Sequence, residues 1–134
     1  METIFDFIRD DILSDIEKIG FDVEAVPLNQ VHAVTYSDAG IVVYNSETCC
    51  LYELAEELHH ARLGHHRQWA GYDIRNHDEK EAHQASLEYL IDRWLYYGGS
   101  QNWLTFITVT GTPGDAEQVI IDAFRTNGGS LATY

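Results

Sequence analysis

The sequence is poor in basic residues. Only 8 Lys and Arg are set against 22 Asp and Glu among 134 residues, which gives a net charge of −14. A surface that binds phosphate groups needs clustered Lys and Arg, and anionic membranes attract proteins by the same means. The composition therefore predicts no direct contact with nucleic acid or with a membrane. It favours a basic protein or a metal cation as the partner.

The chain also has few cysteines and no long apolar run. Its two cysteines, Cys49 and Cys50, are adjacent in the sequence, and neighbouring cysteines rarely form a relaxed disulfide. No apolar run approaches the roughly 20 residues of a membrane span. The acidic N-terminal stretch also differs from a signal peptide, which has an apolar core. These features predict a cytoplasmic protein in a reducing compartment.

What the sequence does contain is enough apolar material for a core. Hydrophobic residues make up 45% of it, so we predict one domain over residues 1–134 that needs neither a disulfide nor a metal to fold. Residues 2–19 have apolar side chains three and four apart, which predicts an amphipathic helix that ends at Gly20. Those apolar positions are Ile4, Phe5, Ile8, Ile12, Leu13, Ile16 and Ile19.

Strand signals follow between residues 22 and 45. Val23 and Ala25 mark one short strand, while residues 31–36 and 41–44 are rich in β-branched and aromatic side chains. The turn residues 37–40 between the last two segments are typical of a hairpin. We predict a small antiparallel three-stranded sheet.

Two longer helices are predicted next. The first begins after an N-cap at Asn45, Ser46 or Thr48 and continues to about His66. The second covers about residues 78–97, behind a capping box formed by residues 76 and 79.

The last third of the chain has weaker signals. Residues 103–109 fit either a strand or a buried helix, because a short apolar run has no distinguishing period. Residues 115–125 read as a helix with a possible capping box of Asp115 and Gln118, and we expect a mobile tail from about residue 127. The predicted fold class is α+β, with helices at both ends of the chain.

Chemistry concentrates where four of the seven histidines lie, between residues 59 and 66. Residues four apart share a helix face, so Glu56 and His60 can point at one ion, with Glu57 beside them. This spacing is that of the His-Glu-x-x-His helix of zinc proteases, in which the Glu is the general base. Here the first position is Glu56 instead of histidine.

A longer stretch around this motif resembles the ImmA/IrrE family of metallopeptidases. Residues 54–65 are similar to that family's Leu-Ala-His-Glu-Leu-x-His-x-x-Leu-Gly-His helix. The hairpin before the helix and the segment Glu79–Ser86 after it are similar to family segments in the same order. The resemblance implies a zincin-like domain and a cytoplasmic peptidase that cleaves a transcriptional repressor, or another regulatory protein, of a phage or mobile element.

The resemblance also implies roles for single residues. Glu57 would be the catalytic base, His60 a metal ligand and Glu81 the carboxylate ligand, with Glu56 standing where the family has a histidine ligand. Zn²⁺ is the implied metal, and a second carboxylate shifts the preference towards Mn²⁺ or Fe²⁺. His65, and also His59, would support the site from outside by hydrogen bonding.

Several alternatives stay open at this point. His59, His65 and His66 can simply face solvent, and His77 or His83 can replace Glu56 as a ligand. The leading alternative function is that of a catalytically degenerate member, which binds a repressor stoichiometrically as an antirepressor or inhibitor. A helix pair without any metal is the third interpretation. The sequence makes no prediction of the oligomeric state.

Overall fold

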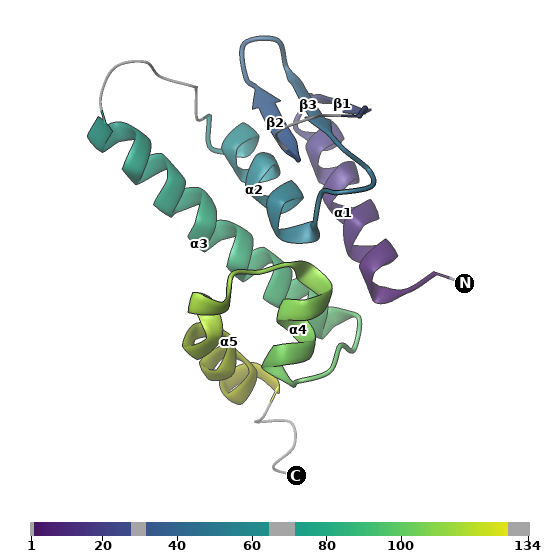
Figure 1. Ribbon diagram of the computed structural model, residues 1–134, viewed down its shortest axis with the longest axis vertical. Coiled ribbons are helices and arrows are strands. Elements are labelled where there is room, and N and C mark those ends of the chain that lie inside the picture. The colour runs from purple at the N-terminus through teal and green to yellow at the C-terminus, as the bar shows by residue number, and fades with distance from the viewer. Residues whose placement is uncertain (1, 28–31, 65–71, 129–134) are drawn as a thin grey trace.

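The computed structural model describes residues 2–27, 32–64 and 72–128 (Figure 1). This part of the chain forms five α-helices and a three-stranded sheet, which confirms the predicted α+β class. The elements, in chain order, are α1 (Ile4–Lys18), β1 (Asp22–Ala25), β2 (Ala33–Tyr36), β3 (Ile41–Tyr44), α2 (Leu51–Arg62), α3 (Tyr72–Tyr96), α4 (Trp103–Thr110) and α5 (Glu117–Ala123).

Helix α1 forms where its apolar period predicts it. Thr3 and Asp6 close a capping box at its start, with the Thr3 N–H donating to the Asp6 carboxylate over 2.9 Å. This reciprocal bond satisfies backbone donors that have no partner within the helix. Its inward stripe of isoleucines, at positions 8, 12 and 16, is fully buried. Beyond its end, Gly20 adopts a left-handed φ of 93°, which a residue with a side chain rarely adopts.

The sheet has the predicted three strands but is mixed rather than antiparallel. β2 and β3 form the expected antiparallel hairpin, whereas β1 pairs with β3 in parallel and the strand order is β1-β3-β2. The physical reason is that the chain reverses twice between β1 and β3. The two strands therefore run in the same direction when β3 is inserted beside β1.

Helix α2 differs from its prediction at both ends. Its N-cap is Cys50, whose N–H donates to the Glu53 carboxylate over 3.1 Å. Asn45 instead accepts from the N–H of Glu47, which closes a turn before the helix begins. The helix ends at Arg62, four residues earlier than expected, and Gly64 then has a left-handed φ of 73°.

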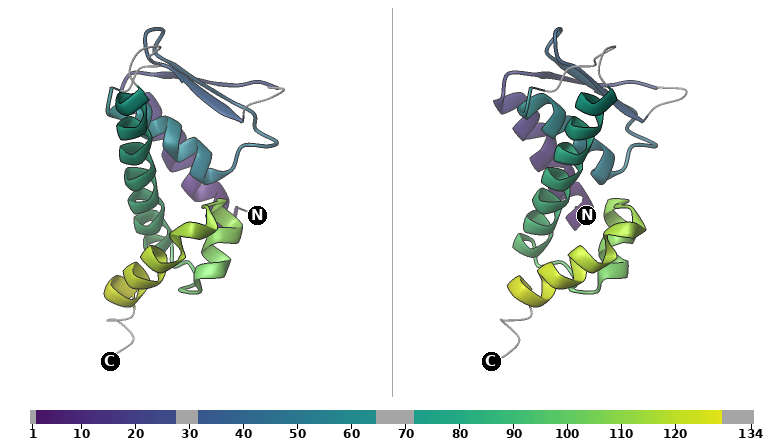
Figure 2. Two further views of the ribbon diagram at one scale, coloured as in Figure 1. Left: turned by 60° about the vertical axis from the view of Figure 1, so that its left-hand side comes forward. Right: turned by 90° about the vertical axis from the view of Figure 1, so that its left-hand side faces the viewer.

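Helix α3 starts at residue 72, six residues before its predicted start. The predicted capping box at residues 76 and 79 is therefore wrong, because both positions lie inside the helix. The first part of this helix is polar, so no apolar period marks where it begins. Figure 2 shows α2 between the sheet and α3, and α2 contacts both of them.

The described C-terminal part is mostly helical. Residues 103–110 form α4, a segment for which the sequence pattern did not distinguish a strand from a helix. Asn102 caps this helix by accepting hydrogen bonds from two backbone N–H groups. The expected helix near residues 115–125 is a 3₁₀ turn, α5 and a π turn in succession. The predicted Asp115 box is wrong, since Ala116 precedes α5 and Gln118 bonds Asp122. Most of the predicted tail lies outside the described residues.

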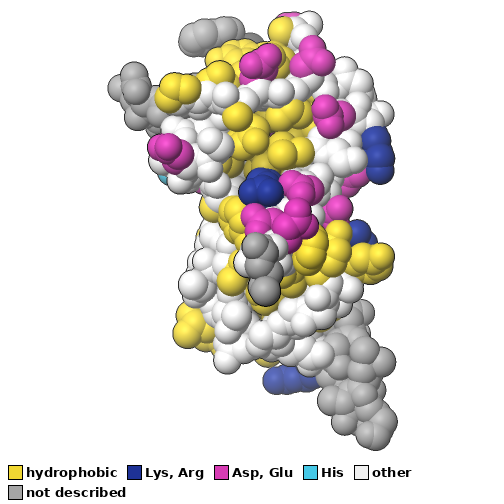
Figure 3. Space-filling view, turned by 90° about the vertical axis from the view of Figure 1, so that its right-hand side faces the viewer, with side chains coloured by type: hydrophobic (Ala, Val, Ile, Leu, Met, Phe, Trp, Pro, Cys, Tyr) yellow, Lys and Arg dark blue, Asp and Glu magenta, His cyan; other side chains and the backbone are white. Residues whose placement is uncertain are grey.

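The core lies where the helices meet. Trp94, Phe106 and Phe124 pack edge to face there, with ring centroids 5.4 and 5.7 Å apart along the series. On the face drawn in Figure 3, acidic side chains occur at several places beside hydrophobic ones. Among the described residues, no helix combines the length and apolar character that a membrane crossing requires.

Candidate metal and catalytic site

Two helix faces meet at the candidate site. On α2, Tyr52, Glu56 and His60 recur every four residues and so lie along one face. On α3, Glu79 and His83 have the same spacing, and the two helices pack along each other. An open pocket of about 510 Å³ between them is lined by Glu56, Glu79, Lys80, His83 and Gln84.

His60 and Glu79 link the two helices at one end of this site. The His60 Nε2 lies 3.6 Å from a Glu79 carboxylate oxygen. The His60 side chain is 16% exposed and that of Glu79 is 57% exposed, so the pair lies at the boundary between core and solvent. An imidazole and a carboxylate in this position can share a proton or a cation.

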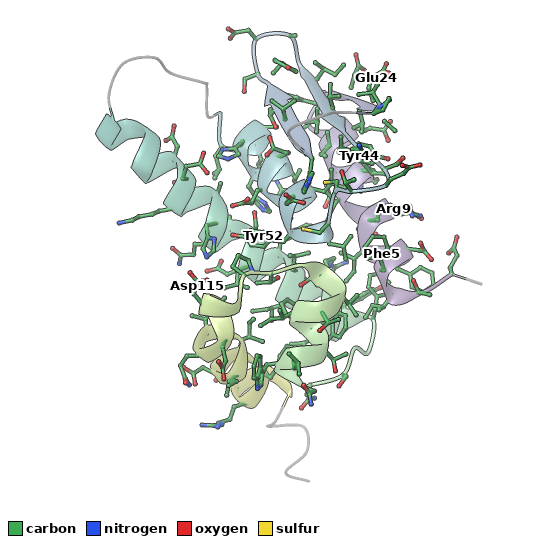
Figure 4. All side chains as sticks on the ribbon, viewed as in Figure 1. Phe5, Arg9, Glu24, Tyr44, Tyr52 and Asp115 are labelled. Atoms are coloured by element: carbon green, nitrogen blue, oxygen red, sulfur yellow. The ribbon has the colours of Figure 1, made fainter. Side chains whose placement is uncertain are left out.

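Tyr52 links the helices one to two turns away. Its hydroxyl is hydrogen-bonded to Nδ1 of His83, and the Glu56 side chain lies one turn along the same face of α2, close enough for the hydroxyl to lower the pKa of that carboxyl group. The Tyr52 ring is only 5% exposed and meets the His83 ring edge to face at 5.4 Å. Figure 4 shows Tyr52 at the start of α2, on the side that faces α3 and the segment of Asp115. Burial, and then the nearby Glu56 carboxylate, raise the pKa of Tyr52, so the phenol keeps its proton.

Glu56 is the most perturbed carboxyl group of the site. The pKa of Glu56 is raised to about 7, chiefly by burial and to a smaller extent by the neighbouring Glu79 and Glu53 carboxylates, although the Tyr52 hydrogen bond acts to lower it. Partial desolvation beside other carboxylates makes the negative charge of Glu56 costly. A cation in the pocket would offset that cost.

Glu57 lies on the adjacent face of α2 and is tied to the sheet. The Thr35 hydroxyl lies 2.8 Å from Oε1 of Glu57 and 3.1 Å from its backbone carbonyl. Thr35 belongs to β2, an outer strand of the sheet. The carboxylate expected to act as a base is thus oriented by a hydroxyl from another element.

The α3 carboxylate that lies 3.6 Å from the His60 ring is that of Glu79, two residues before the predicted Glu81. Glu81 is exposed and is not among the residues that line the pocket. Helix geometry explains the difference, since residues two apart are rotated by about 200° and residues four apart by only about 40°. Glu79 therefore shares the site-facing side of α3 with His83, and Glu81 does not.

His59, expected as a possible outer support, is a core residue. It is 4% exposed, and its Nδ1 lies 2.7 Å from the Ala55 carbonyl oxygen and 3.3 Å from the Ser86 hydroxyl. Burial lowers its pKa, which keeps the ring neutral near pH 7. The predicted roles of His65 and His66 fall on residues outside the described part, and so does the side chain of His77.

The chemical types of the donor groups at this site are those that bind divalent transition metals. Imidazole and carboxylate groups ligate Zn²⁺, Mn²⁺ and Fe²⁺, and Glu56, His60 and Glu79 supply one imidazole and two carboxylates. In their positions here, however, no three Cys, His, Asp or Glu side chains of the described residues form a group that could hold an ion. We therefore derive no chemical step through a metal.

Sequence reasoning missed three residues of this site, namely Tyr52, Glu79 and His83 in their observed roles. A signal for them was present, because Tyr52 precedes Glu56 by four residues and Glu79 precedes His83 by four. In comparisons with known proteins, no family model matches the chain and no curated protein matches it.

Proposed function

We propose that the protein is a metal-dependent peptidase of the ImmA/IrrE type, which cleaves a repressor or another regulatory protein of a phage or mobile element. The observation that supports this most is that Glu56 of α2 and Glu79 of α3 line one open pocket, while Glu79 also lies 3.6 Å from His60. Glu56 and His60 are spaced on α2 as the ligands of a zinc-protease helix are. The acidic chain favours a basic segment of the protein partner.

In this proposal Glu56, His60 and Glu79 would hold the metal, with Glu79 in the role expected of Glu81. Zn²⁺ is the first choice, and the second carboxylate makes Mn²⁺ or Fe²⁺ a reasonable occupant. When bound, such an ion polarises a carbonyl group and lowers the pKa of a water molecule. A set with two carboxylates offsets more of the ion's charge than one with two imidazoles, which weakens both effects.

Glu57 would supply the proton transfer. Its place on α2, one residue after Glu56, puts it on the face adjacent to the proposed ligands. The Thr35 hydroxyl already orients the Glu57 carboxylate, so less conformational entropy of this side chain is lost in the reaction. Glu57 would take a proton from the attacking water and pass it to the leaving amine.

The metal assignment is tested by titrating Zn²⁺ and Mn²⁺, by calorimetry, into protein that has no histidine tag. We expect Glu79→Gln to weaken binding by at least tenfold, because it removes a charged ligand. Glu81→Gln is the matched control on the same helix and should change affinity by less than twofold. An equal loss in both variants, or a loss in Glu81→Gln alone, would contradict the ligand set proposed here.

The second candidate function is that of a stoichiometric regulator that binds its partner without cleaving it. It is favoured by the observation that no three ligand side chains of the described residues form a metal group. In such a protein the pair of His60 and Glu79 would stabilise the packing of α2 on α3 rather than hold an ion.

Glu57→Gln separates the two candidates. A peptidase should lose about 10²–10⁴-fold in cleavage rate, the usual worth of general acid–base catalysis, and keep its affinity for the partner. The assay follows cleavage and complex formation with a candidate repressor, and Glu88→Gln on exposed α3 surface is the control. A stable complex without cleavage by the unmodified protein, with Zn²⁺ present, would favour the regulator.

A further inference from the structure

Tyr52 occupies a position that the proposed ligand set does not explain. Its hydroxyl is hydrogen-bonded to His83 of α3, and Glu56 lies beside it, one turn further along its own helix, where the hydroxyl lowers the pKa of the Glu56 carboxyl group. The ring is almost fully buried, so the hydroxyl has little freedom to turn to other partners. A phenol has one proton to donate and lone pairs with which to accept, and its two partners therefore impose a direction on the bonds.

We propose that Tyr52 is a positioning residue that donates its proton to the Glu56 carboxylate and accepts a hydrogen bond from Nδ1–H of His83. The three side chains then form one directed series from His83 through Tyr52 to Glu56. This inference rests on the proposed function in one respect, since it names what orients a carboxylate that would hold the metal.

The direction follows from the chemistry of the partners. An ionised carboxylate can only accept, so Tyr52 must give Glu56 its single proton. His83 must then be the donor in the remaining bond, and its neutral ring carries the hydrogen on Nδ1 and the lone pair on Nε2. Free histidine in water prefers the opposite arrangement, with the hydrogen on Nε2. The proposed series therefore predicts an unusual tautomer of His83, which can be measured.

Positioning of this kind matters more for glutamate than for the histidine of the resembling family. A glutamate side chain has one more rotatable bond than histidine and loses more rotamer freedom when it is fixed. Hydrogen bonds to metal-binding side chains typically change metal affinity 10–100-fold. Tyr52 is itself held by its burial and by the edge contact with His83 at 5.4 Å, so it can hold Glu56 in turn.

The first test measures the tautomer of His83 by ¹⁵N NMR of histidine-labelled, metal-free protein at pH 9, where Glu56 is ionised. We expect the Nδ1–H tautomer in the unmodified protein and the Nε2–H tautomer in Tyr52→Phe. Tyr36→Phe is the control, because it removes a phenol hydroxyl at a half-exposed position on β2, away from α3. It should leave His83 unchanged. An Nε2–H tautomer in the unmodified protein would overturn the proposed direction.

The second test measures Zn²⁺ affinity in the same variants. We expect a loss of about tenfold in Tyr52→Phe and none in Tyr36→Phe. His83→Asn keeps an N–H near the position of Nδ1 and should retain most of the affinity, whereas His83→Leu should lose it as Tyr52→Phe does. Equal affinities in all four variants would show that Tyr52 does not position a ligand. If the unmodified protein binds no metal, the proposed function fails, and the tautomer alone decides the series.

Discussion

His59 and His60 are neighbours in the sequence, but α2 directs them into different surroundings. His60 faces Glu79 at the pocket, whereas His59 is buried and bonded to the Ala55 carbonyl. A single helical step of about 100° separates a site residue from a core residue. A cluster of histidines in a sequence therefore need not be a cluster in space.

The buried His59 predicts a loss of stability in acid. Its pKa in the folded protein is lowered by burial from an ordinary value of 6.5, so the unfolded chain binds the proton more tightly. The free energy of unfolding should then fall as the pH drops below 6.5, by at most about 1.4 kcal/mol per pH unit. Urea unfolding at a series of pH values between 5 and 8 measures it.

This experiment requires a control, because the titration of Glu56 changes the free energy of unfolding with pH in the opposite direction to that of His59. Its folded pKa is raised to about 7 from 4.5, so its contribution to stability falls as the pH rises between those values. His59→Asn keeps a donor for the Ala55 carbonyl and cannot titrate. The difference between the unmodified protein and His59→Asn isolates His59, and a difference that does not change with pH would refute this prediction.

The two cysteines are a further contrast at the residue scale. Burial, and then the nearby Glu53 carboxylate, raise the pKa of Cys49, and burial raises the pKa of Cys50 to about 11. Thiols with raised pKa values are poor nucleophiles at neutral pH. This agrees with a site chemistry that depends on carboxylates and imidazoles.

At the scale of elements, local signals predicted most of the fold. Three features each depend on residues that are close together in the sequence: the isoleucine stripe of α1, the turn of the β2–β3 hairpin and the apolar stripe of α2. The parallel pairing of β1 with β3 depends on where β3 is inserted. No local pattern contains that information, and the antiparallel prediction was wrong for this reason.

In the candidate site, too, some features follow from local sequence and others depend on tertiary packing. The proximity of Glu56 to His60 was predictable, because both belong to one helix. Which residues of α3 face them depends on the rotation of α3 about its own axis, and the packing of that helix turns Glu79 and His83 to the site. The choice between Glu79 and Glu81 therefore needed the tertiary structure.

Contacts between α1 and α3 show how that rotation is held. The Tyr97 hydroxyl donates to Asp11 over 2.6 Å, and the Tyr89 hydroxyl donates to Asp15 over 2.8 Å. Arg93 adds an ion pair with Asp11 at 3.4 Å. Asp11 and Asp15 are one turn apart on α1, and Tyr89, Arg93 and Tyr97 follow one another at one-turn intervals along α3 and directly after it. These bonds therefore resist rotation of α3 and help to keep its other side turned towards α2.

At the scale of the whole molecule, the dominant property is the excess of acidic residues, with 22 Asp and Glu against 8 Lys and Arg. Acidic side chains occur at several places on the face in Figure 3. Repulsion among them acts against the compact state. Ion pairs such as that of Arg93 with Asp11 act in the other direction, but there are too few basic residues to pair with every acid.

We therefore expect salt to stabilise this protein. Raising NaCl from 0.02 to 0.5 M shortens the screening length to a few ångströms and weakens long-range repulsion more than close ion pairs. The free energy of unfolding should rise by about 1 kcal/mol, measured as a higher urea midpoint with an unchanged slope. The double variant Glu24→Gln/Glu117→Gln, at two exposed positions, reduces the net negative charge by two. It should be more stable at low salt and respond less to NaCl. A midpoint that falls with salt would mean that attractive pairs outweigh the net charge, and that the acidic excess is not what limits the stability of the fold.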